Sequence, residues 1–144
     1  MKQLPWERLY IGIAGLGAAD CALDETIKYV KERKAFGKRV FDFQNTKFKL
    51  AELKTKVEVT RSFINDCIQK LISGELDAAT ASMAKYWGSQ IQGEVLDECV
   101  QLHGGYGFMA EYPVARMWTD ARVQKIYGGT NEIMKELIAR SLDT

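Results

Sequence analysis

The chain has 144 residues, of which 47% are hydrophobic and 27% are charged, and its net charge at pH 7 is +1. This composition is that of an ordinary globular protein, and the length suits one domain with a sizeable core. Because bulk affinity for nucleic acid or for an anionic membrane needs a basic surface, neither is an expected partner. The longest apolar stretch, residues 9–19, contains three glycines and is too short for a membrane span.

The three cysteines, Cys21, Cys67 and Cys99, are odd in number, widely spaced and set in helical sequence. We expect them to be buried, reduced thiols of an intracellular protein, and the sequence carries no secretory signal peptide. His103 is the only histidine, and no Cys-x-x-Cys pair occurs. The sequence therefore predicts no metal site.

Helical periodicity dominates the sequence, which has only two prolines and no hairpin dipeptide or alternating run. The first helix is predicted over about residues 5–34, with Gly37 as its C-terminal cap. Its apolar residues recur at three- and four-residue steps and mark the side that faces the core: Leu9, Ile13, Leu16, Ala19 and Leu23. Three glycines flatten this helix and favour close packing: Gly12, Gly15 and Gly17.

Two further long helices are predicted, over about residues 42–73 and 77–103. Gly74 ends the earlier one and Asp77 caps the later one. Their apolar sides are expected to comprise Phe48, Leu50, Leu53, Val57, Ile64, Cys67, Ile68 and Leu71, then Ala81, Ala84, Ile91, Val95 and Leu102. A fourth helix starts at Pro113 and runs to about residue 126, and Thr130 caps a last helix to about residue 142. The fold class is therefore all-α, an antiparallel four-helix-type bundle of three long and two shorter helices.

Two glycine turns interrupt this helical sequence, at residues 101–108 (QLHGGYGF) and 127–133 (YGGTNEI). Glycine is about 1 kcal/mol less favourable than alanine inside a helix. Glycine pairs therefore mark places where the backbone must turn sharply or approach something closely. Two such places in one small chain suggest a large flat ligand that lies across helix ends.

Three groups of residues together carry a family resemblance. In chain order they are Arg33, Phe36, Gly37 and Gln44; Gln101, Gly104, Gly105 and Gly107; and Asp120, Arg122, Gly129, Thr130 and Ile133. At these spacings the chain resembles the C-terminal helical domain of the flavin-dependent acyl-CoA dehydrogenases, over nearly its whole length. Residues 126–140 look most like the long-chain branch of that family.

The resemblance implies contacts with FAD from two directions. Toward an FAD held mainly by the neighbouring subunit, it implies Arg33 at the pyrophosphate, Ala35, Phe36 and Gln44 at the adenosine side, and Gln101, Gly104 and Gly105 at the ADP portion. Toward this subunit's own FAD it implies Thr130, Asn131 and Glu132, at a helix N-terminus that favours phosphate. A guanidinium suits the pyrophosphate because it grips phosphate oxygens in a fork.

Each of these features also has a plain structural interpretation. Arg33 alone is typical of an exposed cation near a helix end, and Gly104-Gly105 of a simple cap and turn. Phe36 alone is typical of a core residue. The joint occurrence of the three groups, rather than any one residue, favours a flavin site.

The catalytic base departs from the commonest family pattern. Most relatives carry glutamate where this chain has Gly128, but the long-chain and isovaleryl branches place it on the first helix, directly before an arginine. Glu7-Arg8 stands at that place. The resemblance implies that Glu7 removes the substrate α-proton, although an acidic residue in a first helical turn is also favoured by the helix dipole. The implied substrate contacts are Arg8, Gly129 and Arg140.

The whole resemblance implies α,β-dehydrogenation of acyl-CoA, with FAD as cofactor and electron-transferring flavoprotein as electron acceptor. The family enzyme also has an N-terminal helical domain and a middle β-domain, so residues 1–144 are expected to be a C-terminal fragment that folds alone, homo-oligomerises and is inactive. An isovaleryl-CoA dehydrogenase, an acyl-CoA oxidase, a non-catalytic oligomerisation bundle and a DNA-binding relative are the alternatives. The mitochondrial matrix is the expected compartment, with the bacterial cytoplasm as the alternative.

Overall fold

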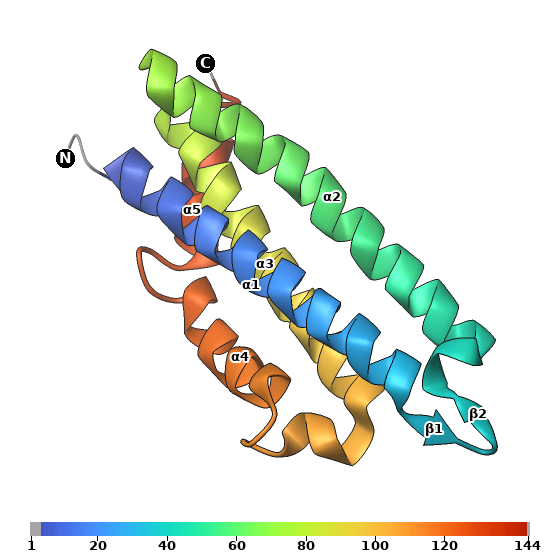
Figure 1. Ribbon diagram of the computed structural model, residues 1–144. Helices are drawn as coiled ribbons and strands as arrows, with labels where there is room; N and C mark the ends of the chain where they lie inside the picture. The colour runs from blue at the N-terminus through green and yellow to red at the C-terminus, as the bar shows by residue number, and fades with distance from the viewer. Residues whose placement is uncertain (1–3, 144) are drawn as a thin grey trace.

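The computed structural model describes residues 4–143, in which three long helices run down, up and down and two short ones pack along them (Figure 1). The long helices are α1 (Leu4–Glu32), α2 (Gln44–Ser73) and α3 (Ala78–His103), and the short ones are α4 (Pro113–Ala121) and α5 (Asn131–Arg140). Short 3-10 turns join them: η1 (Val40–Asp42), η2 (Gly104–Phe108) and η3 (Arg122–Lys125). The predicted all-α bundle is therefore confirmed.

The helix ends follow the predicted capping residues. The Asp77 carboxylate accepts the Thr80 N–H at 2.8 Å, and the Thr130 hydroxyl accepts the Ile133 N–H. Gly74, with φ of 77°, ends α2 while the next N–H, of Glu75, donates to the Lys70 carbonyl, as in a Schellman cap. Two capping side chains and one left-handed glycine thus set three of the helix boundaries.

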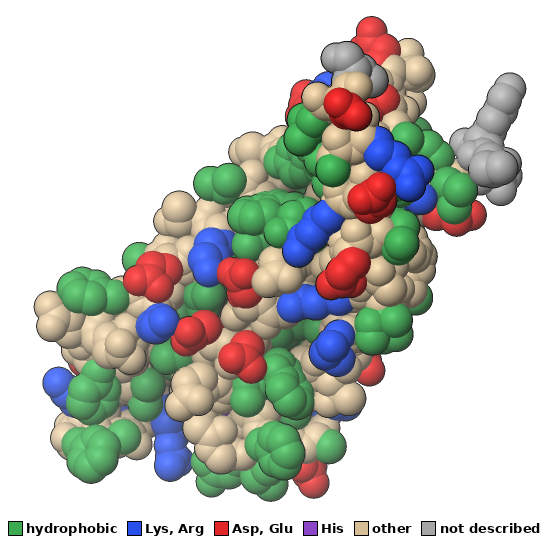
Figure 2. Space-filling view, turned by 180° about the vertical axis from the view of Figure 1, so that it is seen from behind, with side chains coloured by type: hydrophobic (Ala, Val, Ile, Leu, Met, Phe, Trp, Pro, Cys, Tyr) green, Lys and Arg blue, Asp and Glu red, His purple; other side chains and the backbone are tan. Residues whose placement is uncertain are grey.

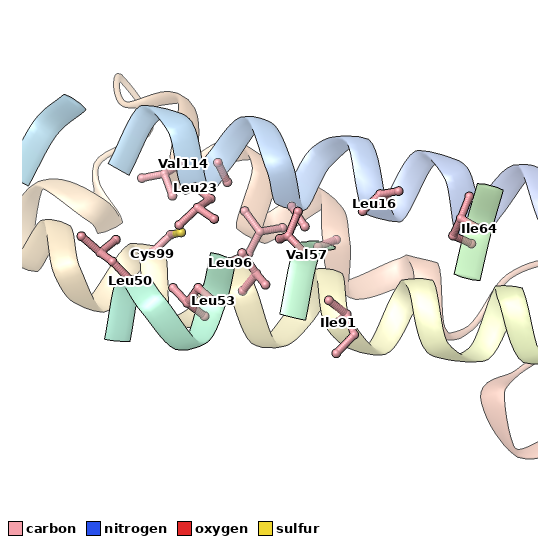
Figure 3. Packing of buried hydrophobic residues seen from close by; sticks show 14 of the residues in the cluster. Leu16, Leu23, Leu50, Leu53, Val57, Ile64, Ile91, Leu96, Cys99 and Val114 are labelled. Carbon is pink, nitrogen blue, oxygen red and sulfur yellow. The ribbon is translucent and has the colours of Figure 1, made fainter. Parts of the chain in front are cut away.

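The core lies between α1, α2 and α3, and Figure 3 shows its apolar side chains meeting along the bundle axis. The helices α1 and α3 approach most closely, because two glycines face α3 across this interface. A Cβ atom on Gly12 would lie 2.6 Å from the Ala84 carbonyl oxygen, and one on Gly15 would lie 2.8 Å from that of Gly88. The expected close packing is confirmed at these two positions, whereas Gly17 faces open space.

The segment after α1 differs from the prediction. A two-stranded hairpin, β1 (Lys34–Ala35) and β2 (Lys38–Arg39), replaces the last predicted turn of the helix. Phe36 and Gly37 form its turn with φ of 51° and 80°, the left-handed values that a two-residue hairpin needs. Gly37 is therefore wrong as a helix cap, and the expectation of no hairpin is wrong as well.

Several smaller expectations are also wrong. Helix α2 begins two residues late because η1 precedes it, α4 ends at Ala121 and gives way to η3, and α5 ends at Arg140. Three residues expected in the interior lie at the surface: Ile13, Phe48 and Cys21. Ile13 and Phe48 sit at the margin of an apolar stripe, where a step of three or four residues no longer points at the core.

The surface is mixed in charge. Figure 2 shows acidic and basic side chains interleaved over the rear face, in keeping with the small net charge. Within residues 4–143, no helix is both long and apolar enough to cross a membrane. The same residues contain no cluster of histidine, cysteine and carboxylate groups that could hold a metal ion.

Candidate functional site

A groove of about 530 Å³ opens where α1 and α3 end side by side. It brings together four of the residues predicted for cofactor binding: Arg33, Gln101, Gly104 and Gly105. The Arg33 guanidinium lies over the Tyr106 ring, 5.4 Å from its centroid. This cation–π contact holds the guanidinium beside the glycine turn, because Tyr106 directly follows Gly105.

The half-buried Tyr29 and the buried His103 hold the glycine turn of this groove. The Tyr29 hydroxyl donates to the His103 carbonyl at 3.2 Å, and the two rings stack with centroids 4.2 Å apart. The His103 Nδ1 lies 2.8 Å from the Cys99 carbonyl oxygen, so Nδ1 carries a proton and donates. Burial lowers the pKa of His103, which therefore serves as a neutral part of the scaffold. The turn at Gly104, with φ of 62°, thus starts from a fixed helix end.

The other predicted adenosine-side residues lie beside the groove rather than in its lining. Phe36 is 96% exposed at the hairpin tip, which excludes its interpretation as a core residue. Its ring meets Phe43 edge-on at 6.3 Å. Ala35 is half-buried in β1, and Gln44 begins α2 with an exposed side chain. The hairpin and the first turn of α2 therefore form an outer rim next to the Arg33 groove.

A second region surrounds the N-terminus of α5, at the opposite end of the bundle (Figure 1). Gly128 and Gly129 have φ of 65° and 94°, so the loop before α5 needs glycine at both positions. Thr130, Asn131 and Glu132 line a small pocket of about 160 Å³. Backbone N–H hydrogen bonding at the start of the helix holds the pKa of the Glu132 carboxyl below its ordinary value.

The Asn131 side chain faces the protein interior and has partners that the sequence did not reveal. Its Oδ1 accepts from the Lys85 Nζ at 2.8 Å, and its Nδ2 donates to the Ser89 hydroxyl at 3.0 Å. Lys85 is fully buried, and burial lowers its pKa to about 8. A signal was present, because Lys85 falls on the same three- and four-residue steps as the apolar residues of α3.

Glu7, the predicted base, is exposed in the first turns of α1. A Cβ atom built on Gly128 would collide with Ile11 Cδ1, and Ile11 lies one helical turn after Glu7. Position 128 and Glu7 therefore flank the same strip of the α1 surface.

The three predicted substrate contacts do not form one cluster. The Arg8 Nη1 lies 3.4 Å from the Ser82 hydroxyl, and its Nε is buried with no hydrogen-bond partner among the described residues. Gly129 is half-buried beside Met134. Arg140 lies at the far end of α5 and pairs with Glu136 in solvent, so the structure does not bring it to the other two.

Comparison with known proteins gives one consistent result. The family model described as "Acyl-CoA dehydrogenase, C-terminal domain" matches residues 1–142. The mitochondrial long-chain specific acyl-CoA dehydrogenase of Mus musculus is 56% identical over 99% of this chain, which spans only 33% of that protein. The crystal structure of an acyl-CoA dehydrogenase from Geobacillus kaustophilus matches with a TM-score of 0.97 and 45% identity, over all of this chain and 38% of that one.

An acyl-CoA dehydrogenase from Bacillus anthracis, solved in complex with FAD, also matches, with a TM-score of 0.90 and 28% identity over 96% of this chain and 27% of that one. The chain thus spans about a third of the length of the curated relatives that it matches.

Proposed function

The chain belongs to the acyl-CoA dehydrogenase family, whose C-terminal domain it matches. From this we propose that it is part of an FAD enzyme that dehydrogenates long-chain acyl-CoA thioesters. In this proposal it forms the helical third of a longer polypeptide, whose other parts complete the flavin and CoA sites. The isolated helical domain would then be inactive, because it lacks those parts.

Glu7 is the proposed base, and the observation that carries this role is the position of Gly128. A side chain at 128 would point at Ile11, one turn from Glu7, so a carboxylate from either position would approach one volume above α1. With glycine at 128 no side chain from this position enters that volume. Glu7 Oε would take the α-proton of the thioester, and a positioned carboxylate contributes about 10²–10⁴-fold to such a step.

FAD, when bound, supplies the acceptor for the hydride that leaves the β-carbon. The donor set of the Arg33 groove fits the diphosphate of that cofactor. Arg33 offers a fork of N–H donors, and the Gly104-Gly105 turn lets backbone approach an anion without side-chain obstruction. The exposed ring of Phe36 suits an adenine face on the outer rim. Gln101, Ala35 and Gln44 complete this surface.

At the other end, Thr130 and Glu132 at the α5 N-terminus are proposed to lie by this subunit's own FAD, with Asn131 acting through its backbone. Arg8, Gly129 and Arg140 are proposed to face the acyl-CoA. Electron-transferring flavoprotein is the proposed electron acceptor, and a homo-oligomer is proposed because the Arg33 groove would serve a neighbouring subunit. The proposed compartment is the mitochondrial matrix, with a bacterial cytoplasm as the alternative.

Two related functions would use the same fold. An isovaleryl-type enzyme would prefer a short branched acyl group, and an oxidase would pass electrons from the reduced flavin to oxygen. The 56% identity to the mouse long-chain specific enzyme supports the long-chain assignment. A purely structural oligomerisation bundle would need neither the Arg33 groove nor Glu7.

The test uses a chimera in which residues 1–142 replace the matching third of the mouse long-chain enzyme. Without oxygen, long-chain acyl-CoA should bleach the visible absorbance of its flavin. Glu7→Gln should keep the flavin and bind substrate but bleach about 10³-fold more slowly. Glu25→Gln on the same helix is the matched control, since it removes a carboxylate that pairs with Lys28 at the surface. Loss of flavin from the parental chimera, or bleaching of Glu7→Gln at the control's rate, would contradict the proposal.

A further inference from the structure

Lys85 is a buried cation that contacts no carboxylate among the described residues. Its side chain is fully buried, and no ion pair among residues 4–143 includes it. The acidic group that acts on it is Glu132 of α5, whose side chain is exposed. Burying an unpaired amine opposes folding, and an apolar side chain of similar length would fill the space without that penalty. Lys85 is therefore poorly explained as a stabilising residue.

Lys85 orients the side-chain amide of Asn131. Lys85 and Ser89 are one turn apart on α3, and they hold the Asn131 carboxamide from both ends, at 2.8 Å from Oδ1 and 3.0 Å from Nδ2. A hydrogen bond from a charged donor is stronger than a neutral one, so the ammonium fixes which way the amide points. With an apolar residue at 85, Oδ1 would lose this donor.

The held residue sits at the end of a loop with little stiffness of its own. Asn131 is the first residue of α5 and follows Gly128, Gly129 and Thr130 directly. Both glycines occupy left-handed backbone conformations, and Gly128 abuts Ile11 of α1. The contact between Lys85 and Asn131 therefore anchors one end of the Gly128–Thr130 loop to α3 while the loop lies against the first turns of α1.

We propose that Lys85 is a positioning residue, which holds the Gly128–Thr130 loop beside the strip of α1 that carries Glu7 by fixing Asn131 on α3. Lys85 itself touches neither substrate nor cofactor in this account. The inference rests on the proposed function for its consequence, since the loop then forms one wall of the acyl site opposite the base. The anchoring of the loop by the amine does not depend on the proposed function.

Hydrogen exchange on the 144-residue chain tests the anchoring. Lys85→Met should raise the exchange rates of amides 128–134 by about tenfold or more, because those amides then open locally. Lys85→Arg, which keeps a charged donor, should recover part of the protection. Val95→Ala, a fully buried change on α3 farther from α5, is the control and should not select this loop. The inference would be overturned if amides 128–134 exchanged at equal rates in Lys85→Met and Val95→Ala once the rates are corrected for the global stability of each variant.

Bleaching kinetics on the same chimera test the consequence. Lys85→Met should lower the rate at saturating acyl-CoA about tenfold, as expected for a misplaced reacting pair, with little change in flavin content. Adding Asn131→Ala should lower it no further, since both changes break one contact. An equal loss of rate in a Val95→Ala chimera of matched thermal stability would reduce Lys85 to a merely structural residue. If the parental chimera fails to bleach, the proposed function fails, while the exchange result still decides whether Lys85 anchors the loop.

Discussion

Replacing Gly88 with alanine should destabilise the bundle, although alanine is the better helix former. A Cβ atom at Gly88 would lie 2.7 Å from the Gly12 Cα and 2.8 Å from its carbonyl oxygen. Ordinary contact begins at 3.4 Å, so α1 and α3 would have to separate by about 0.7 Å along their shared interface. The opposing atoms are backbone, which cannot rotate away as a side chain can.

The magnitude follows from two opposing effects. Overpacking a core destabilises by about 1–3 kcal/mol, and opposition by backbone favours the upper end of that range. The higher helix propensity of alanine returns about 1 kcal/mol. The net loss is therefore about 2 kcal/mol, which lowers Tm by about 4–8 °C for a chain of this size.

Thermal and urea unfolding, followed by far-UV circular dichroism, measure this loss. Gly17→Ala is the control, because nothing lies within 4 Å of a Cβ at that exposed position of α1. It should stabilise the chain by about 1 kcal/mol. A Gly88→Ala variant as stable as the wild type would refute the close crossing of α1 and α3.

Three further predictions concern the site. Gly128→Glu should restore no activity to a Glu7→Gln chimera in the bleaching assay unless Ile11→Ala removes the side chain with which it collides; rescue by Gly128→Glu alone would contradict this geometry. Arg33→Lys should weaken FAD binding to the chimera about tenfold, measured by quenching of flavin fluorescence, because an ammonium cannot form the guanidinium fork; unchanged affinity would remove Arg33 from the cofactor site. Lys85 has a pKa lowered to about 8, so the unfolded chain binds more protons than the folded chain between about pH 8 and 10.5. Urea unfolding should therefore show the wild type gaining stability relative to Lys85→Met as pH rises through this window, by about 3 kcal/mol; a flat difference would mean that burial does not lower the pKa of Lys85 in the folded chain.

The helices and their ends were predictable because the deciding interactions are local. Asp77 and Thr130 cap the helices that follow them, and Gly74 provides the left-handed residue that ends α2. The core of α1 followed from three- and four-residue steps, except at Ile13, which lies at the edge of the stripe. A local rule identifies a cap, but only the neighbouring helices decide where a stripe ends.

The hairpin and the contact of Lys85 with Asn131 were not predictable for a different reason. Phe36-Gly37 is not among the dipeptides that favour a two-residue turn, so nothing local distinguished that turn from a helix cap. Lys85 is buried because α5 folds over it and supplies Asn131, a contact between residues 46 positions apart. The Arg33 groove was predicted as a set through the family resemblance, whereas its support by Tyr29 and His103 became visible only in three dimensions.

The central claim is that Glu7 removes the α-proton, and proton exchange tests it without the hydride step. An acyl-CoA with sulfur in place of the β-carbon cannot give up a hydride, so it isolates the work of the base. In D₂O the parental chimera should exchange the α-hydrogens of this compound for deuterium, as followed by mass spectrometry. Glu7→Gln should bind the compound equally well and lose exchange by about 10²-fold or more. Exchange at the parental rate in Glu7→Gln would contradict the account and assign the base to another residue.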